Sequence, residues 1–351
     1  MKLKFSRKAL VAMLAVSALT LSACSSSSDD ASGDIKVSLI LKNQTNPFFV
    51  SMVKGAEAKA AELGIDLTIS SGKEEGDDAA QITAIENAIS AKHAGIVITV
   101  MSTNVNAAIT KAREAGLLVI ALDTPTDPAD IADITFATDN REAGRLIGQW
   151  GAKKLGGQKA VIALLNIFDD RVSPVDYLRD NGFLEGMGIP TNDPNKMADE
   201  AKKGKYSGGD YEIVGNVATG ANEDGGRTGM EKLLAKNPNI NIVYTINEPT
   251  AIGACAALKA AKKTAIMVSV DGGLSGIEAV KSGCIGATSQ QYPLRMADFG
   301  LQAIYDLVKT GKKPAVTAGK DFFDTGVTLI TDDPQDGVKS EGTQYGIDNA
   351  W

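Results

Sequence analysis

The sequence predicts an α/β protein made of two lobes, each built on a doubly wound parallel sheet. Apolar runs of strand length alternate with amphipathic helical windows from Ile35 onward, which is typical of parallel sheets that helices cover on both faces. This alternation occurs twice along the chain. The 351 residues also exceed the length at which a single hydrophobic core keeps growing. Together these observations favour two lobes over one large domain.

The first series of elements begins with a strand and a helix that the local residues define well. An apolar run at 37–41 leads through a polar turn into a helix that Asn46 can cap, that Pro47 can begin and that Gly64 can end. Further strands are expected at 66–69, 96–100, 117–122 and 135–137, and further helices at 77–91 and 104–115. These elements predict the first lobe.

The second series repeats this architecture and predicts the second lobe. Its helices are expected at 141–154, 174–187, 223–235, 249–261 and 274–281, and its strands at 160–165, 213–217, 242–245, 266–270 and 285–289. Residues 189–210 contain Pro, Asn, Lys and Gly, and we interpret them as a solvated insertion. A helix at 294–309 and a strand at 327–330 then precede a polar tail.

The start of the chain is typical of an exported protein. Basic residues precede an apolar stretch at 9–21 that is too short to span a membrane comfortably. The following Leu-Ser-Ala-Cys resembles a bacterial lipoprotein box, which implies a signal peptide at 1–23 and lipidation of Cys24; an ordinary signal with a fortuitous cysteine is the alternative. Residues 24–34 are then a flexible tether. We therefore expect an extracytoplasmic protein, lipid-anchored to the cell membrane.

Charge and cysteine content limit the possible partners. Removal of residues 1–23 takes away four positive charges and no negative ones, so the net charge changes from −7 to −11. This acidic balance argues against a nucleic-acid partner. Cys255 and Cys284 remain, and we expect free thiols because the two residues should lie at different heights on the second sheet. An exported chain could still pair them.

The usual groups for catalysis and cofactor binding are missing from the sequence. His93 is the single histidine, and its place at the end of a helix favours a surface role, so neither a Ser-His-Asp arrangement nor a His-based zinc site can form. The first strand is not followed by GxGxxG, and the chain has no GxxxxGK[ST] loop. We expect no catalytic residue, no metal and no cofactor, and we infer that the protein is not an enzyme.

Polar side chains instead follow the predicted strands, where ligands bind in doubly wound sheets. They are Thr99, Asp123 with Thr124, Asn247 with Glu248, Asp271, and Gln290 with Gln291. Phe48 and Phe49 lie in the first helical turn beside them; a plain core position is the alternative for both rings. Carboxylates, amides and aromatic faces suit a neutral polyhydroxylated ligand, because buried hydroxyls need donors and acceptors.

Several segments resemble the ribose-type, LacI-like sugar-binding proteins of bacterial ABC importers. They are Asn46-Pro47-Phe48-Phe49, residues 121–125, 137–140, 247–249, 270–272 and 287–293, in order along the chain. Residues 123–128, 175–179 and 320–327 are most similar to the fructose-binding branch. The resemblance implies a type I periplasmic-binding-protein fold with three hinge crossovers. It also implies one lobe of residues 35–138 plus 292–323 and another of residues 139–291 plus 324–351.

The resemblance also implies a set of ligand-binding residues. Asp123, Asn247, Asp271 and Gln291 would hydrogen-bond hydroxyls, and Phe48 and Phe49 would pack on the sugar ring. The full predicted set is Asn46, Phe48, Phe49, Thr99, Asp123, Thr124, Asp139, Tyr177, Asn222, Asn247, Asp271 and Gln291.

The sequence departs from the ribose-binding pattern at three places in this set. Ribose binders carry an Arg where Thr124 stands, an Arg where Tyr177 falls, and an aromatic residue near Ala221 and Asn222. The loss of two cations and one aromatic face predicts a neutral cleft with different donors, and it favours fructose over ribose with pentoses possible.

The expected function is therefore capture of a monosaccharide by hinge closure and its delivery to an ABC permease. We expect a monomer whose partners are the sugar, the permease subunits and, through Cys24, the membrane. A sugar-sensing co-receptor without transport is the main alternative, and a sugar-modifying enzyme is a further one.

Overall fold

The computed structural model describes residues 35–351. The predicted signal peptide, the tether and Cys24 lie outside the described residues. Within the described part, no helix is both long and apolar enough to cross a membrane.

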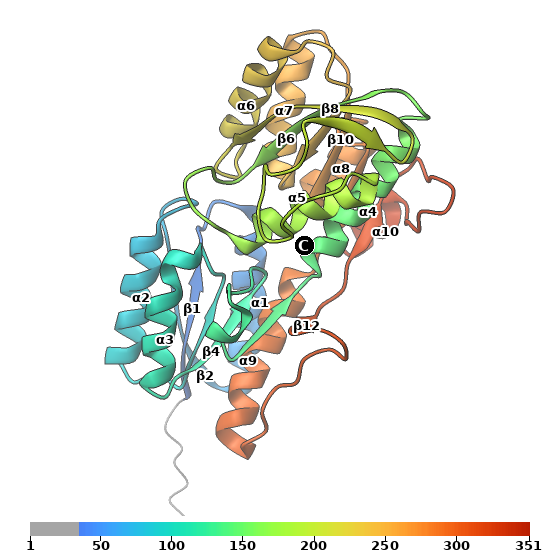
Figure 1. Cartoon of the computed structure of the whole chain (residues 1–351). Coiled ribbons are helices and arrows are strands. Elements are labelled where there is room, and N and C mark those ends of the chain that lie inside the picture. The colour runs from blue at the N-terminus through green and yellow to red at the C-terminus, as the bar shows by residue number, and fades with distance from the viewer. Residues whose placement is uncertain (1–34) are drawn as a thin grey trace, which may run out of the picture. The chain divides into compact units, whose positions relative to one another are not determined.

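Lobe 1 is built on a six-stranded parallel sheet in the order β12-β5-β4-β3-β1-β2 (Figure 1). Its strands are β1 (Ile35–Leu41), β2 (Ile65–Ser71), β3 (Gly95–Ile98), β4 (Leu118–Leu122), β5 (Ile134–Ala137) and the short edge strand β12 (Phe323–Asp324). The central strands are buried along almost their whole length, because helices cover both faces of the sheet.

Two pairs of helices cover the lobe 1 sheet. Helices α1 (Pro47–Leu63) and α9 (Pro293–Thr310) share one apolar cluster with the sheet. Helices α2 (Asp78–Ser90) and α3 (Asn106–Glu114), with the short turns η1 (Thr103–Val105) and η2 (Ala129–Ile131), lie on the other face. Helix α1 has the predicted ends: the Asn46 side chain accepts a hydrogen bond from the Phe48 amide, and Gly64 ends the helix with φ 65°.

Lobe 2 contains a seven-stranded sheet in the order β13-β11-β10-β9-β6-β8-β7. The strands β6 (Ala160–Asn166), β8 (Gly209–Ala218), β9 (Ile242–Thr245), β10 (Ile266–Asp271) and β11 (Ala287–Gln290) are parallel, whereas the edge strands β7 (Lys203–Tyr206) and β13 (Thr328–Ile330) are antiparallel. Residues 189–210 are largely exposed, as expected of a solvated insertion, and residues 203–206 within them also form a hairpin with β8.

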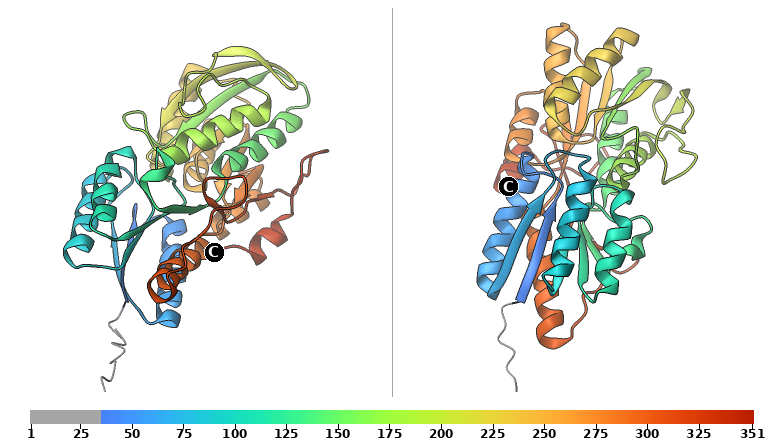
Figure 2. Two further views of the ribbon diagram at one scale, coloured as in Figure 1. Left: turned by 60° about the horizontal axis from the view of Figure 1, so that its bottom comes forward. Right: turned by 90° about the vertical axis from the view of Figure 1, so that its left-hand side faces the viewer.

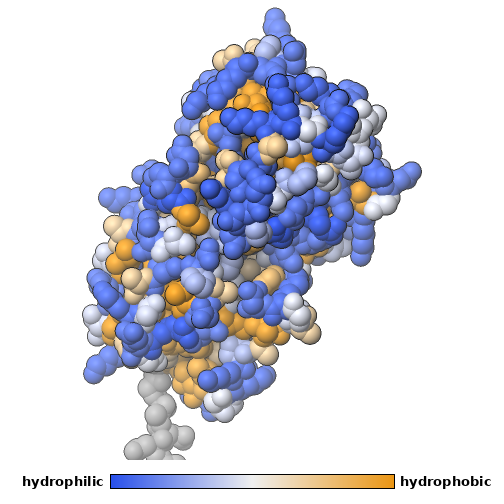
Figure 3. Space-filling view, in the orientation of Figure 1, coloured by the Kyte–Doolittle hydropathy of each residue, from blue (hydrophilic) through white to orange (hydrophobic). Residues whose placement is uncertain are grey.

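The lobe 2 helices also form two layers. Helices α4 (Asn140–Lys154) and α5 (Pro174–Met187) cover one face, and α6 (Glu223–Lys236), α7 (Glu248–Ala260) and α8 (Leu274–Lys281) cover the other, with α10 (Thr343–Asp348) packed on α8. Helices α4 and α5 approach closely because glycines face each other: a Cβ at Gly148 would lie 2.1 Å from the Phe183 carbonyl oxygen. Polar residues cover most of the face shown in Figure 3.

Within residues 35–351 the chain passes between the two sheets three times (Figure 2). Residues 138–139 join β5 to α4, residues 291–292 join β11 to α9, and residues 325–327 join β12 to β13. The predicted fold class, with two doubly wound lobes and three crossovers, is confirmed.

The expectation of free thiols is wrong, because Cys255 and Cys284 form a disulfide with Cα atoms 6.0 Å apart. Helix α7 runs back from the carboxyl edge of the sheet, so Cys255 lies about 10 Å below the start of the helix. The turn after α8 brings Cys284 to the same depth, and both residues pack against one apolar cluster.

Candidate functional site

A small cavity lies where the carboxyl ends of the two sheets face each other. Its volume is about 30 Å³. It is lined by residues of both lobes: Lys42, Asn46, Phe48, Phe49, Glu75 and Asp123 from lobe 1, and Ile167, Val175, Arg179, Ala221, Ile246, Asn247 and Asp271 from lobe 2. This is the place that the strand-end residues predict. We refer to it as the cleft.

Two buried carboxylates face each other across the cleft. Asp123 follows β4 and Asp271 ends β10, and each is only 4% exposed. Both have left-handed or strained backbones, with φ of 61° for Asp123 and 146° for Asp271. Positive φ at a residue other than glycine is unfavourable and persists where the surroundings hold it, commonly at binding or catalytic sites. The strain at both carboxylates points to a ligand site.

Arg179 bridges these two carboxylates. Its Nη2 lies 3.4 Å from an Asp123 oxygen, and its Nη1 lies 3.8 Å from an Asp271 oxygen. Its Nε also donates to Asn140 Oδ1 at 2.8 Å, and Nη1 donates to the Ile246 carbonyl at 3.0 Å. The guanidinium is therefore fixed by residues of both lobes and is placed to donate to a ligand hydroxyl.

A second cation, Lys42, also lines the cleft. Its Nζ lies 3.2 Å from Glu75 Oε1, and both side chains are almost fully buried. The Lys42 amide donates to Thr99 Oγ1 at 3.0 Å. Thr99 therefore does not line the cleft itself but contacts the lining residue Lys42. The cleft therefore contains two cations, Lys42 and Arg179, that the comparison with ribose binders did not identify, and each lies beside a carboxylate. A buried ion pair of this kind adds both a donor and an acceptor to the site.

Glu248 holds the loop that carries Asp271. Its carboxylate accepts from the amides of Gly272 and Gly273 at 2.8 and 3.0 Å and from the Thr288 hydroxyl at 2.8 Å. Burial raises the pKa of Asp271, an effect that Arg179 opposes and Asp123 reinforces. Burial also raises the pKa of Glu248, and the nearby Asp271 adds to this rise.

The side-chain oxygen of Gln291, next to Asp271, has no hydrogen-bond partner among the described residues. The Gln291 Nε2 donates to Asp271 Oδ1 at 3.1 Å, whereas Oε1 is buried and unpaired within residues 35–351. An unpaired buried amide oxygen is costly. Gln291 itself does not line the cleft, so its predicted contact with a ligand stays a prediction.

Phe48 and Phe49 are both core residues and lining residues. Their rings meet edge to face at 5.4 Å, and each side chain is almost fully buried in the apolar cluster of α1 and α9. Both also line the cleft. The core interpretation is therefore confirmed for both rings. Because both rings also line the cleft, contact with a ligand stays a prediction.

A family model described as "Periplasmic binding protein domain" matches residues 37–313. The chain belongs to this family. The chain is 28% identical to the ribose import binding protein of Haemophilus influenzae over 290 residues, which are 82% of this chain and 90% of that protein. It is 26% identical to the D-allose-binding periplasmic protein of Escherichia coli, over 84% of this chain and 91% of that protein.

Solved structures of other solute-binding proteins show the same fold. A solute-binding protein from Burkholderia multivorans, with an unknown ligand assigned as α-D-erythrofuranose, has a TM-score of 0.71 at 25% identity, covering 85% of this chain and 100% of its own. A solute-binding protein from Agrobacterium vitis with bound D-fucose also has a TM-score of 0.71, at 24% identity and with coverages of 86% and 97%.

Some predicted site residues lie elsewhere in this periplasmic binding protein. Thr124 donates to Asp123 Oδ2 at 2.9 Å and supports that carboxylate from behind. Tyr177 and Asp139 line a separate cavity of about 260 Å³ beside the crossover at 138–139, where the Tyr177 hydroxyl donates to Asp127 at 3.1 Å. Asn222 is exposed and caps α6 through the Gly225 amide. None of these four residues lines the cleft, and a role in ligand binding stays a prediction for each.

The placement of Tyr177 explains why sequence reasoning missed Arg179. Residues two positions apart on a helix point in nearly opposite directions. Tyr177 and Arg179 both belong to α5, so when one faces the side cavity the other faces the cleft. Lys42 and Glu75 gave no sequence signal, because they lie in loops after β1 and β2.

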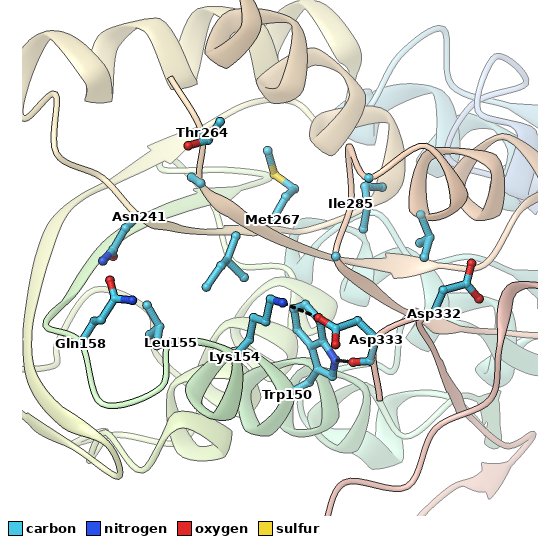
Figure 4. A pocket seen from close by; sticks show the side chains of 15 residues that line it. Trp150, Lys154, Leu155, Gln158, Asn241, Thr264, Met267, Ile285, Asp332 and Asp333 are labelled. Atoms are coloured by element: carbon cyan, nitrogen blue, oxygen red, sulfur yellow. Dashed lines mark hydrogen bonds and ion pairs between the residues drawn. The ribbon is translucent and has the colours of Figure 1, made fainter. Parts of the chain in front are cut away.

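The larger hollow in Figure 4 is not the candidate site of this binding protein. It is an open groove of about 550 Å³ around Trp150, Lys154 and Asp333, at the amino ends of β9 and β10. Trp150 Nε1 donates to the Asp333 carbonyl at 2.8 Å, and Lys154 pairs with the Asp333 carboxylate. Ligands of such sheets bind at the carboxyl ends of the strands, which is the opposite edge.

His93 does not line the cleft. His93 is half-buried next to the Ser38 hydroxyl, 2.9 Å from its Nδ1, and burial lowers the pKa of its imidazole. Among residues 35–351 no group of three or more His, Cys, Asp or Glu side chains is arranged to hold a metal ion.

Proposed function

We propose that this protein captures a monosaccharide in the cleft and delivers it to an ABC permease. The single observation that carries the proposal is the pair Asp123 and Asp271, both buried, both at positive φ and both bridged by Arg179. Carboxylates that accept and a guanidinium that donates match the hydroxyls of a sugar. The names of the relatives, which bind or import ribose and allose, support the same ligand class.

Lobe closure is the proposed means of capture. A cavity of about 30 Å³ is far smaller than the roughly 300–1,000 Å³ of typical small-molecule sites. A sugar can therefore enter only when the lobes separate, and the crossovers at 138–139, 291–292 and 325–327 are the segments where the backbone can bend. On closure the sugar would take over contacts that Arg179 now makes with the two carboxylates.

Fructose is the proposed sugar, with pentoses as the second choice. The proposal rests on the similarity of residues 123–128, 175–179 and 320–327 to the fructose-binding branch. The argument from missing cations no longer excludes ribose, because Arg179 and Lys42 supply two donors. Calorimetric titration with fructose, ribose, xylose, arabinose, galactose and glucose tests the proposal. Tightest binding of fructose supports it, and no heat with any of the six sugars refutes the sugar-binding function.

We further propose an extracytoplasmic, monomeric protein anchored through Cys24. The family and the disulfide Cys255–Cys284, which needs an oxidising space, support an exported location. The anchor is tested by cell fractionation: Cys24→Ser should move the protein from the membrane fraction to the soluble fraction. An unchanged distribution would refute lipidation.

Binding without turnover is part of the proposal, because the relatives are named as import and binding proteins. Incubation with ¹³C-labelled fructose should return the sugar unchanged by NMR. Transport and sensing differ in the partner: loss of sugar uptake in a strain that lacks the protein supports transport, and intact uptake supports the sensing alternative.

A further inference from the structure

Trp351 lies at the junction of the two lobes and contacts parts of the chain that are far apart in the sequence. Its ring meets the Phe48 ring edge to face, with centroids 5.3 Å apart and an interplanar angle of 85°. Its Nε1 donates to the carbonyl of Gln291 at 3.1 Å, within the crossover at 291–292. The views in Figures 1 and 2 agree that the chain ends where the two lobes meet, and Figure 2 shows this end beside α1.

The segment that carries Trp351 is anchored on lobe 2. Helix α10 packs on α8, and a Cβ at Gly346 would lie 2.8 Å from the Ile277 side chain. Gln290, the last residue of β11, donates from its Nε2 to the Gly346 carbonyl at 2.9 Å. From this anchor the chain crosses to lobe 1, where Trp351 packs against the apolar cluster that contains Phe48.

Trp351 also packs against the loop that follows the cleft carboxylate Asp271. A Cβ at Gly273 would lie 2.8 Å from Trp351 Cη2, so the indole rests directly on that backbone. The ring is thus held between Gly273 of lobe 2 and Phe48 of lobe 1. Trp351 itself does not line the cleft, whereas Phe48 does.

We propose that Trp351 is a positioning residue: residues 343–351 form a strap from lobe 2 that holds Phe48 against the cleft and stabilises the closed arrangement. This inference rests on the proposed function, because it assigns a role in sugar retention. Contacts made only when the lobes are together stabilise that state, and they lower the rate at which a bound ligand escapes. Edge-to-face aromatic pairs and indole hydrogen bonds both favour the geometry seen here.

The test compares three variants of the full chain. Trp351→Ala removes the ring and the hydrogen bond, and Trp351→Phe keeps an aromatic ring but loses the N–H donor. The matched control is Trp150→Phe, which loses the same kind of indole hydrogen bond, to the Asp333 carbonyl, inside lobe 2. The chain has only these two tryptophans, so Trp150→Phe also leaves Trp351 as the single tryptophan reporter.

The measurements use the sugar of the calorimetric panel that binds most tightly. For Trp351→Ala we expect Kd to rise about tenfold, equivalent to about 1.4 kcal/mol, through faster dissociation in stopped-flow experiments with a nearly unchanged association rate. Trp351→Phe should raise Kd about threefold, and Trp150→Phe should change it less than twofold. In the Trp150→Phe protein, the Trp351 emission should change on sugar binding.

If Trp351 contributes to stability alone, the Trp351→Ala variant should have a lower unfolding temperature but the same Kd and dissociation rate as wild type. That result would overturn the proposed strap. An emission of Trp351 that does not respond to sugar would overturn it as well. Small-angle scattering of the sugar-free proteins separates this proposal from the proposed function. If no sugar binds the wild-type protein, the proposed function fails. The role of the strap is then tested by the radius of gyration: a larger radius for Trp351→Ala than for wild type supports it, and an equal radius overturns it.

Discussion

Replacement of Arg179 by methionine tests the centre of the proposed site. The guanidinium contacts Asp123, Asp271, Asn140 and the Ile246 carbonyl, and its side chain is only 5% exposed. Methionine is similar in length and cannot donate, so it leaves two buried carboxylates without their shared cation. Truncation of one partner in a buried, hydrogen-bonded charge pair costs about 2–5 kcal/mol. We therefore expect the Kd for fructose to rise by roughly 30-fold to 5,000-fold.

The assay is calorimetric titration at pH 7, with circular dichroism and thermal unfolding to show that the variant is folded. Arg179→Lys keeps the charge but loses the planar fork, so its Kd should lie between wild type and Arg179→Met. The matched control is Arg145→Met, which removes an Arg paired with Glu142 on the surface of α4 and should change Kd little. A folded Arg179→Met variant that binds fructose within a factor of three of wild type would refute the reasoning.

Three further predictions follow from other parts of the structure. Phe48→Ala should raise the Kd for fructose about 30-fold, which corresponds to a loss of about 2 kcal/mol of binding free energy. The control Phe299→Ala, in the same apolar cluster, should lower stability without changing Kd. Equal Kd values for the two variants in calorimetry would contradict this prediction. Burial raises the pKa of Asp176 to about 7, above its unfolded value near 4, so its contribution to the free energy of unfolding is lost as pH rises from about 4 to about 7. Urea unfolding at pH 5 and 7 should show a smaller decline for Asp176→Asn than for wild type, and an equal decline would be evidence against the buried neutral carboxyl. Reduction of the disulfide Cys255–Cys284, whose residues are 29 apart in sequence, should lower the free energy of unfolding by about 3–4 kcal/mol and leave the sugar Kd unchanged; identical urea unfolding with and without reductant would show that the bond is absent.

Local sequence signals predicted much of the fold. Half of the twelve ligand-binding residues predicted from the sequence line the cleft. Asn46, Pro47 and Gly64 define α1 because capping, the first helical position and the left-handed end depend on single residues. Asp123 and Asp271 could be placed because residues that directly follow parallel strands share one edge of the sheet. In each case, one residue and its immediate neighbours determine the outcome.

Arg179 and Trp351 could not be predicted in this way. The direction of Arg179 depends on the rotation of α5 about its axis, which the packing of Gly182 and Gly186 against α4 fixes. Trp351 reaches Phe48 only because two lobes and a crossover bring residues about 300 positions apart into contact. The pairing of Cys255 with Cys284 likewise depends on how α7 and the turn after α8 are placed relative to each other along the sheet. These contacts are properties of the assembled fold.

The three crossovers have a consequence for how the chain is made. Neither lobe is a continuous stretch of sequence: the lobe 1 cluster includes Met296, Leu301 and Ile304 of α9, which follow β5 by about 160 residues. At a synthesis rate of roughly 5–20 residues per second, the part of the lobe 1 sheet that α9 covers beside α1 stays exposed for about 10–30 s after β5 has left the ribosome. The first core of the chain is therefore completed only after most of lobe 2, from β6 to β11, has been synthesised.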